Sequence, residues 1–275
     1  MSISFHWFLP TNGDGRRLVE PASAVPGTAG GQRPATFGYL TQVALAAESF
    51  GFVGALTPTG PWCDDAWITT AALAQRTERL KFLVAFRPGV MSPTLAAQMA
   101  ATYQFHTGGR LLLNVVTGGD DAEQHAYGDW LDKGGRYERC AEFLQIVRGL
   151  WSGEPVDFEG QHLQVERAAL GRIPDPLPEI YFGGSSPAAL DVAARHVDAY
   201  LTWGEPPDLV AEKVARVRAL AEAQGRTVRF GIRLHVVSRD RAEDAWAAAE
   251  ALLDGISEEE IAKVHAQMQQ TQSEG

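Results

Sequence analysis

The sequence predicts an eight-stranded α/β barrel, the (β/α)8 or TIM barrel fold, from three observations. Apolar stretches of strand length alternate with longer amphipathic segments, which is typical of parallel βα units. Polar and glycine-rich sequences follow the strand-like stretches, where the functional loops of a barrel lie. The chain has 275 residues, and one barrel of about 250 residues accounts for this length as a single domain over 1–275.

Seven barrel strands can be placed along the chain, with helices between them. The predicted strands are Ile3–Leu9, Phe52–Thr57, Leu80–Phe86, Leu111–Thr117, Glu179–Phe182, Ala199–Trp203 and Val228–Val237. The predicted helices are Phe37–Phe50, Asp64–Arg76, a segment starting near Pro93, Arg136–Leu150, segments starting at Ser186 and Pro207, Asp240–Leu253 and Glu258–Gln270.

Local signals support individual elements. Leu40, Val43 and Ala47 share one face of the first helix because their spacing follows the period of 3.6 residues. Pro93 suits the first turn of the third helix, where its missing N–H costs nothing. The stretch Val156–Val165 has a central glycine and predicts a β-hairpin outside the barrel repeat.

Two connections depart from the simple repeat. The polar segment Gly118–Gly135 exceeds the usual length of about 2 to 6 residues for such a loop, so we expect a functional loop or an active-site lid. No eighth strand follows Val237. We therefore expect the barrel to lack its C-terminal part, including strand eight, which would leave the first and seventh strands unpaired at their outer edges.

Composition narrows the function classes. Hydrophobic residues make up 45% of the chain and charged residues 21%, which allows a large core. A net charge of -10 argues against a nucleic-acid partner, because phosphate backbones require clustered Lys and Arg. The two cysteines form no disulfide framework. The N-terminal sequence lacks the features of a secretion signal and no stretch is long enough to span a membrane, so we expect a cytoplasmic protein that binds a small molecule.

The segment Gly183-Gly184-Ser185-Ser186 lies where the fifth barrel strand meets a helix. Unpaired N–H groups and the positive end of the helix dipole favour an anion there, and the hydroxyls add donors. The alternative is that the glycines make the turn and Ser186 caps the helix.

Arg233 and His235 are two residues apart in the last predicted strand, so both side chains should point to the same face at the barrel mouth. The guanidinium suits a sulfonate, carboxylate or phosphate, and an imidazole can change charge near neutral pH. The alternative is a buried salt bridge to a strand carboxylate.

Four other residues lie near predicted strand ends. Cys63 is flanked by Asp64 and Asp65, which oppose thiolate formation, so we expect it to line the site or to be a small apolar filler. Asn114 and Thr117 can contact the edge of a heterocycle, or cap a loop. Trp203 offers an apolar wall, or plain packing. No metal-binding motif and no GxSxG motif occur in the sequence.

Taken together, these motifs resemble the alkanesulfonate monooxygenases of the bacterial luciferase-like flavin enzymes. The likeness extends from about Ser4 to Ile261. It rests on the segments FLPTNGDG, TPTGPWCDDAW, RLKFLVAFRP, NVVTG, RYE, YFGGSS, LTWGEPP and RFGIRLHVV, in that order. The resemblance implies cleavage of the C–S bond of an alkanesulfonate to an aldehyde and sulfite, with O2 and with reduced FMN (FMNH2) from a separate NAD(P)H-dependent FMN reductase. The cofactor carries the oxidative chemistry, and the protein positions it and excludes water.

The resemblance also implies roles for individual residues. Cys63 matches the active-site cysteine near the flavin, and Arg233 and His235 match a pair for sulfonate and proton handling. Residues that match flavin contacts are Asn114, Glu123, Arg136, Tyr137 and Ser186, with Ser186 at the phosphate. With Gly184 and Ser185 of the anion cradle and Thr117, they form the predicted cofactor site; Asn12, Trp203, Arg233 and His235 form the predicted substrate site.

Two departures from the family pattern affect these expectations. Asn12 replaces a histidine that the family carries in this motif, which leaves the substrate open. Relatives also continue further along the chain, with a mobile lid that carries a second substrate arginine and with the eighth strand, and this sequence contains neither. If the chain ends at residue 275, we expect weak or absent oxygenase activity.

The sequence leaves several alternatives open. The substrate could instead be a sulfone or a nitrogen heterocycle, the cofactor could be a deazaflavin, or the chain could bind flavin without turnover. A homodimer or homotetramer is expected, and the alanine-rich faces near Leu95–Ala101 and Ala245–Leu252 could serve it or pack within the chain.

Overall fold

The computed structural model describes residues 3–14 and 33–252, together with 254, 256–259, 261, 262 and 266. The strands in this part of the chain are β1 (His6–Phe8), β2 (Gly54–Thr57), β3 (Lys81–Phe86), β4 (Leu111–Val115), β5 (Val156–Glu159), β6 (Gln164–Ala168), β7 (Glu179–Gly183), β8 (Ala199–Trp203) and β9 (Arg229–Arg233). The helices are α1 (Phe37–Ser49), α2 (Ala66–Ala74), α3 (Pro93–Thr107), α4 (Asp121–Ala126), α5 (Lys133–Leu150), α6 (Pro187–His196), α7 (Pro207–Glu222) and α8 (Ala242–Ala251).

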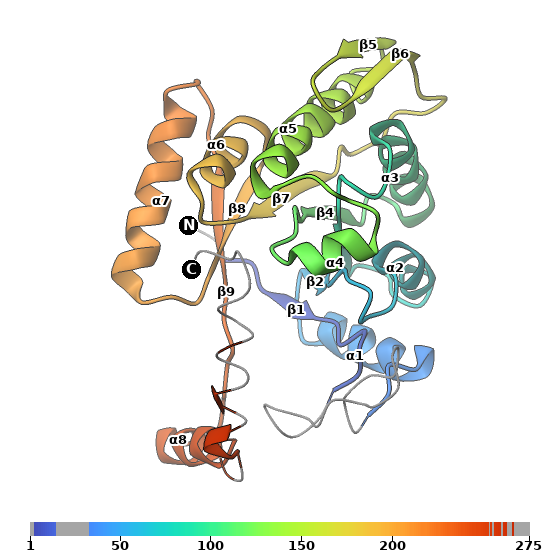
Figure 1. Ribbon diagram of the computed structural model, residues 1–275. Coiled ribbons are helices and arrows are strands. Elements are labelled where there is room, and N and C mark those ends of the chain that lie inside the picture. Colours follow the sequence, from blue (N-terminus) through green and yellow to red (C-terminus); the bar gives the residue numbers. More distant parts are fainter. Residues whose placement is uncertain are drawn as a thin grey trace.

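Seven parallel strands form one curled sheet in the order β1-β2-β3-β4-β7-β8-β9, with helices along its outer face (Figure 1). The hairpin β5–β6 is antiparallel and separate, as the sequence predicts. The predicted fold class is confirmed: the described residues form an α/β fold whose curled parallel sheet of seven strands matches a TIM barrel that lacks its eighth strand. Among the described residues, β1 and β9 each have one neighbouring strand.

Contacts across the concave face show how far the sheet curls. The ring of His6 in β1 lies 6.0 Å from that of Tyr181 in β7, although three strands separate them in the sheet. At the carboxyl ends, the guanidinium of Arg233 in β9 lies 4.8 Å from the ring centre of Phe8 in β1. The two open edges of the sheet therefore approach each other at the barrel mouth.

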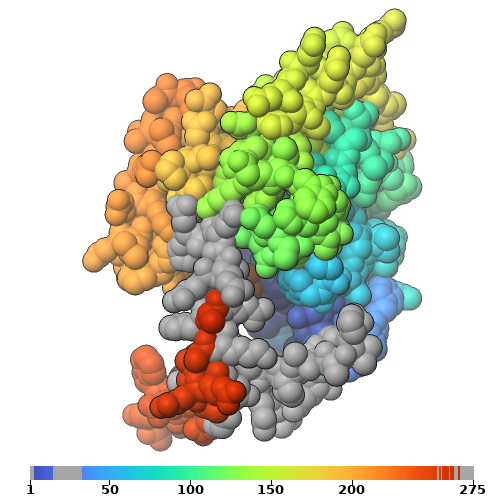
Figure 2. Space-filling view, in the orientation of Figure 1, coloured from blue at the N-terminus to red at the C-terminus, as the bar shows by residue number. Residues whose placement is uncertain are grey.

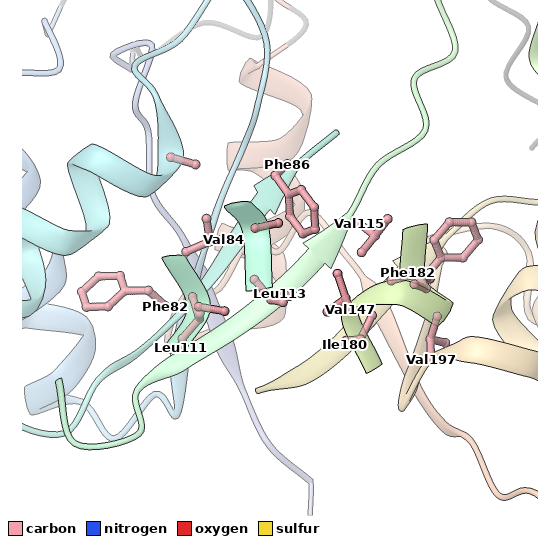
Figure 3. Packing of buried hydrophobic residues seen from close by; sticks show 14 of the residues in the cluster. Phe82, Val84, Phe86, Leu111, Leu113, Val115, Val147, Ile180, Phe182 and Val197 are labelled. Atoms are coloured by element: carbon pink, nitrogen blue, oxygen red, sulfur yellow. The ribbon is translucent and has the colours of Figure 1, made fainter. Parts of the chain in front are cut away.

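The main core fills the space between the sheet and its helices. Alternate residues of β3, β4 and β7 point outward and pack with Val147 and Val197 in the cluster of Figure 3. The intervening residues Leu83, Leu112 and Tyr181 point to the concave face and form a second, smaller cluster. Each fully buried large apolar side chain contributes about 1.5 to 3 kcal/mol. Both faces of β3 and β4 are buried, which fixes the position of the residues that follow them.

Capping residues set where the helices begin. Pro93 occupies the first turn of α3, as predicted, behind the cap Ser92. The prediction that α5 starts at Arg136 is wrong: the helix begins three residues earlier, at Lys133, because Asp132 caps it by accepting from Gly135 N–H at 2.8 Å.

The last predicted strand, Val228–Val237, is too long. β8 ends at Trp203, which pairs with Arg233, so the residues after Arg233 have no strand to pair with on that side. α8 follows with no buried residue and lies apart from the body of the sheet (Figure 1). Most of the predicted helix Glu258–Gln270 lies outside the described residues.

The segment Gly118–Gly135 is not a plain loop, because it contains α4. Three ion pairs tie the segment to its surroundings: Arg87–Glu123, Arg136–Asp121 and Arg139–Asp129. In the space-filling view its green atoms pack against the blue and cyan segment around α2 (Figure 2). The segment is thus joined to the rim by ion pairs in this structure.

Candidate active site

The predicted site residues gather at one rim, because the carboxyl ends of parallel strands meet at the same edge of a sheet. Asn12 and Cys63 follow β1 and β2, Asn114 and Thr117 lie at and after the end of β4, Gly184, Ser185 and Ser186 follow β7, and Trp203 and Arg233 end β8 and β9. The rim has two parts, one around β7 to β9 and one around β2 to β4.

The turn after β7 depends on glycine. Gly184 has φ +143°, and a Cβ at this position would lie 2.8 Å from the Cβ of Ala189 and 3.3 Å from the Oη of Tyr137. Tyr200 Oη donates to the Gly184 carbonyl at 2.7 Å. The Gly184 backbone therefore lies close to the start of α6 and to Tyr137, with no room for a side chain.

The two serines of this turn have different partners. Ser186 Oγ accepts from Ala189 N–H at 3.3 Å, so the alternative that Ser186 caps α6 is correct. Its hydroxyl proton can still be donated to an anion, because the cap uses only a lone pair. Ser185 Oγ accepts from Lys213 Nζ at 2.8 Å, and Glu205 also binds this ammonium group.

Lys213 is a candidate anion-binding residue that the sequence analysis missed. It reaches Ser185 from α7, which begins at Pro207. No local motif marks it, because its approach depends on how α7 packs beside the loop after β7. The N–H groups of Lys213, which Glu205 shares, add to the two hydroxyls and the helix N-terminus as donors that suit a phosphate.

Arg233 lies at the end of β9 between two aromatic rings. Its guanidinium is 4.8 Å from the ring centre of Phe8 and 5.0 Å from that of Trp203. Burial lowers the pKa of Arg233, and no carboxylate of the described residues pairs with it. The alternative of a salt bridge to a strand carboxylate therefore finds no support, and the group is available to an anion.

His235 does not share a strand with Arg233, contrary to the prediction. β9 ends at Arg233, and His235 lies two residues beyond it with an exposed side chain. The alternation of side chains along a strand no longer fixes its direction. Its role in proton handling stays a prediction from the resemblance.

Cys63 is a half-buried thiol in the other part of the rim. Its Sγ donates to the Gly60 carbonyl at 3.5 Å. Burial raises the pKa of Cys63; the Thr11 hydroxyl opposes this shift, and the carboxylates of Asp64 and Glu123 add to it. The thiol is therefore protonated at neutral pH and suits hydrogen bonding better than nucleophilic attack.

Arg87 and Glu123 form a buried ion pair close to Cys63. Nη2 of Arg87 lies 2.7 Å from Oε2 of Glu123, and the ring of Tyr127 lies 5.3 Å from the guanidinium. Arg87 was missed as a site residue although it directly follows β3 in the segment RLKFLVAFRP. Its position after a barrel strand was the available signal.

Arg136 is held inside the protein, with 1% of its side chain exposed. Its Nη1 donates to Asp121 at 2.9 Å and to the Leu131 carbonyl at 2.7 Å. These bonds join Arg136 to the segment around α4 and account for its position without a ligand. Contact of Arg136 with a cofactor therefore stays a prediction.

Other potential sites in the described part of the chain are few. No three His, Cys, Asp or Glu side chains there are grouped to hold a metal ion, and none of the described helices is long and apolar enough to cross a membrane. A cavity of about 490 Å³ includes Arg148, His196, Asp198 and Arg226. Arg148 and Arg226 donate to carbonyls at the end of α6, which explains their presence without a ligand.

Comparison with known proteins places these features in context. A sequence model described as luciferase-like monooxygenase matches residues 3–275. Similar solved structures include a riboflavin lyase with modified FMN and riboflavin, at 20% identity and a TM-score of 0.81, covering 92% of this chain and 67% of the other.

Two further structures show the range of chemistry on this fold. An EDTA monooxygenase from Chelativorans sp. BNC1 is 22% identical with a TM-score of 0.75, covering 92% of this chain and 67% of the other. An F420-dependent secondary alcohol dehydrogenase with an F420-acetone adduct is 21% identical with a TM-score of 0.69, covering 84% and 68%. At these identities the likeness concerns the fold alone. This chain spans about two thirds of the length of these proteins.

Proposed function

The chain belongs to the luciferase-like monooxygenase family, and on this premise we propose that it is an FMNH2-dependent monooxygenase that cleaves the C–S bond of alkanesulfonates. The observation that carries the proposal is Arg233, a cation on the rim between two aromatic rings without a carboxylate partner among the described residues. A sulfonate would supply the missing negative charge.

The turn after β7 supports FMN as the cofactor. The N-terminus of α6, the hydroxyls of Ser185 and Ser186, and Lys213 provide donors for a phosphate group. Gly184 leaves the backbone free of a side chain at this point. FMN offers that phosphate.

Each residue of the proposed site has a defined task. Reduced flavin, when bound, supplies the electrons that activate O2 for cleavage of the C–S bond. Arg233 binds the sulfonate, while Phe8 and Trp203 form apolar walls that limit water around it. The protonated thiol of Cys63 offers a hydrogen bond near the reacting groups. Asn12, Asn114 and Thr117 are proposed as polar contacts to substrate or flavin.

The partners follow from this chemistry. We propose that a separate NAD(P)H-dependent reductase delivers reduced FMN, and that the protein works as a cytoplasmic homo-oligomer, a dimer or tetramer. Sulfones, nitrogen heterocycles and a deazaflavin such as F420 are the alternatives for substrate and cofactor.

The test is a titration of the protein with FMN and butanesulfonate, together with sulfite release in the presence of a flavin reductase. Arg233→Ala should weaken sulfonate binding about 10- to 100-fold, because a charge-assisted hydrogen bond is lost. Arg229→Ala is the matched control: Arg229 lies on the same strand and face but at the opposite end, paired with Glu179 at 2.6 Å. It should leave sulfonate affinity unchanged.

Two outcomes contradict the proposal. Equal sulfonate affinity in wild type and Arg233→Ala removes Arg233 from the site. Oxidation of a sulfone or heterocycle without sulfite release from any sulfonate assigns a different substrate.

A further inference from the structure

Glu205 is a buried carboxylate with one unused oxygen. It follows the end of β8 on the rim, and 10% of its side chain is exposed. Its Oε1 accepts from Lys213 Nζ at 2.5 Å, whereas Oε2 is buried and has no hydrogen-bond donor among the described residues. Burying a carboxylate oxygen without a donor costs free energy, so Oε2 indicates a missing donor.

Glu205 lies beside the donors of the turn after β7. Lys213 connects them, because its Nζ donates both to Glu205 Oε1 and to Ser185 Oγ, at 2.8 Å. Tyr200 is also near: burial, and then the Glu205 carboxylate, raise the pKa of Tyr200 to about 12. Its hydroxyl donates to the Gly184 carbonyl at 2.7 Å, so this proton is not available to Oε2.

The charges around the turn nearly cancel. Lys213 of α7 and Glu205 have opposite charges in direct contact, and the first turn of α6 carries no charged side chain. The other titratable groups here are Tyr200 of β8 and Tyr137 of α5, which acts on the pKa of Tyr200. What remains is the partial positive charge of the α6 N-terminus, about half a unit. This balance suits a ligand with one negative charge better than a ligand with two.

A phosphate monoester meets these conditions in one of its two protonation states. The dianion has only acceptor oxygens, and it would place a second negative charge near the Glu205 carboxylate. The monoanion has a P–OH group, which is a donor for Oε2, while its other oxygens accept from the α6 N-terminus, the hydroxyls and Lys213. The second pKa of a phosphate monoester is about 6, so both states occur near neutral pH.

We infer that the turn after β7 binds the phosphate of FMN as its monoanion, with the P–OH group donating to Glu205 Oε2. FMN that is a dianion in solution therefore takes up one proton from water when it binds. The inference rests on the proposed function in taking FMN as the cofactor with its phosphate at this turn. The bound proton and the role of Glu205 go beyond that function, and they make FMN affinity depend on pH.

The test compares FMN with riboflavin, which lacks the phosphate, at pH 6 and pH 8. Binding is measured by quenching of tryptophan fluorescence in the whole chain, which has 7 tryptophans. Wild type should bind FMN about 50-fold more weakly at pH 8, because the fraction of monoanion falls from about one half to about 1%. Riboflavin affinity should change less than about twofold. Calorimetry at pH 8 in two buffers of different ionisation enthalpy should count about one proton taken up per FMN.

Glu205→Gln tests the carboxylate without changing its shape. The amide oxygen must face Lys213, which has only donors, so an NH2 group takes the place of Oε2 and donates to the phosphate dianion. FMN then binds without taking up a proton, and its affinity should no longer fall between pH 6 and pH 8. A carboxylate that only positions Lys213 would change FMN affinity equally at both pH values and leave the 50-fold ratio in place.

Glu212→Gln is the matched control. Glu212 is the exposed neighbour of Lys213 on α7, so this variant makes the same change in net charge without touching the carboxylate that faces the turn. The 50-fold pH dependence of FMN affinity should persist in it. Loss of the dependence in this variant would assign it to the overall charge of the protein and overturn the inference.

The remaining outcomes separate the inference from the proposed substrate. Equal FMN affinity of wild type at pH 6 and pH 8, or an unchanged pH dependence in Glu205→Gln, overturns the inference. The expected pH dependence without sulfite release from any sulfonate leaves the inference standing and overturns the substrate. A wild type that binds FMN at neither pH overturns both the inference and FMN as the cofactor.

Discussion

Arg87 and Arg233 occupy equivalent positions in two parts of the barrel, and their surroundings differ. Arg87 follows β3, a strand with neighbours on both sides, and is buried against Glu123. Arg233 ends β9, which has one neighbouring strand among the described residues, and lies partly exposed between Phe8 and Trp203. Deep burial of a charge requires a counter-charge within the protein. A partly solvated arginine can lack a counter-charge within the protein, and its positive charge then stays available to an anionic ligand.

The largest expected effect comes from breaking the buried pair. Glu123→Leu leaves the Arg87 guanidinium buried without its counter-charge, and should lower the free energy of unfolding by about 3 to 5 kcal/mol. Urea denaturation measures this. Asp191→Leu is the control, because Asp191 and Arg195 form an exposed pair one helical turn apart; it should cost less than about 1 kcal/mol. Equal losses in both variants would mean that burial does not distinguish the pairs.

A smaller effect is expected for FMN binding at the loop after β7, the part of the rim that is proposed to bind anions. Lys213→Met should weaken FMN binding about 10-fold, because the ammonium group beside Ser185 is lost. Riboflavin lacks the phosphate, so Lys213→Met and wild type should bind it with the same affinity. A parallel loss for both ligands would show that Lys213 only supports the fold of the loop after β7.

The smallest effect concerns the thiol beside the buried pair. Because burial raises the pKa of Cys63, less thiolate is present at pH 8 than in a free cysteine, and alkylation by iodoacetamide should be several-fold slower than for a free thiol. The rate should rise only at a higher pH than it does for a free cysteine. The variant Cys63→Ser measures the alkylation rate of Cys140 alone. Cys140 should stay unreactive, because burial raises its pKa to about 12. Alkylation at pH 7 as fast as that of free cysteine would contradict the assignment.

The sequence predicted the fold well where burial is strong. The strands β2 to β4 appear within two residues of their predicted bounds, because apolar runs between turn residues have few other solutions. Val228–Val237 failed at its end, since strand length there depends on where β8 stops and not on the residues themselves. α4 was missed because its cap, Asp120, stands in a polar segment without apolar periodicity.

The site was predictable only in part, and for a related reason. Ser185, Ser186 and Arg233 could be located because motifs and strand ends place them at the rim. Lys213 and the contact between Arg87 and Glu123 join segments that are distant in sequence, so no local pattern reveals them. The prediction that His235 shares a strand with Arg233 was wrong because β9 ends at Arg233, so strand alternation does not fix the direction of His235.

The contact between Arg233 and Phe8 links the first strand of the sheet to its last. An anion that draws the Arg233 guanidinium away from the Phe8 ring would remove this contact between β1 and β9, the two edge strands of the described sheet. The side chain proposed to bind the anion is thus also the one that contacts the opposite edge of the sheet. Any anion that binds Arg233 must compete with the contact between its guanidinium and the Phe8 ring, which joins the two edges of the curled sheet.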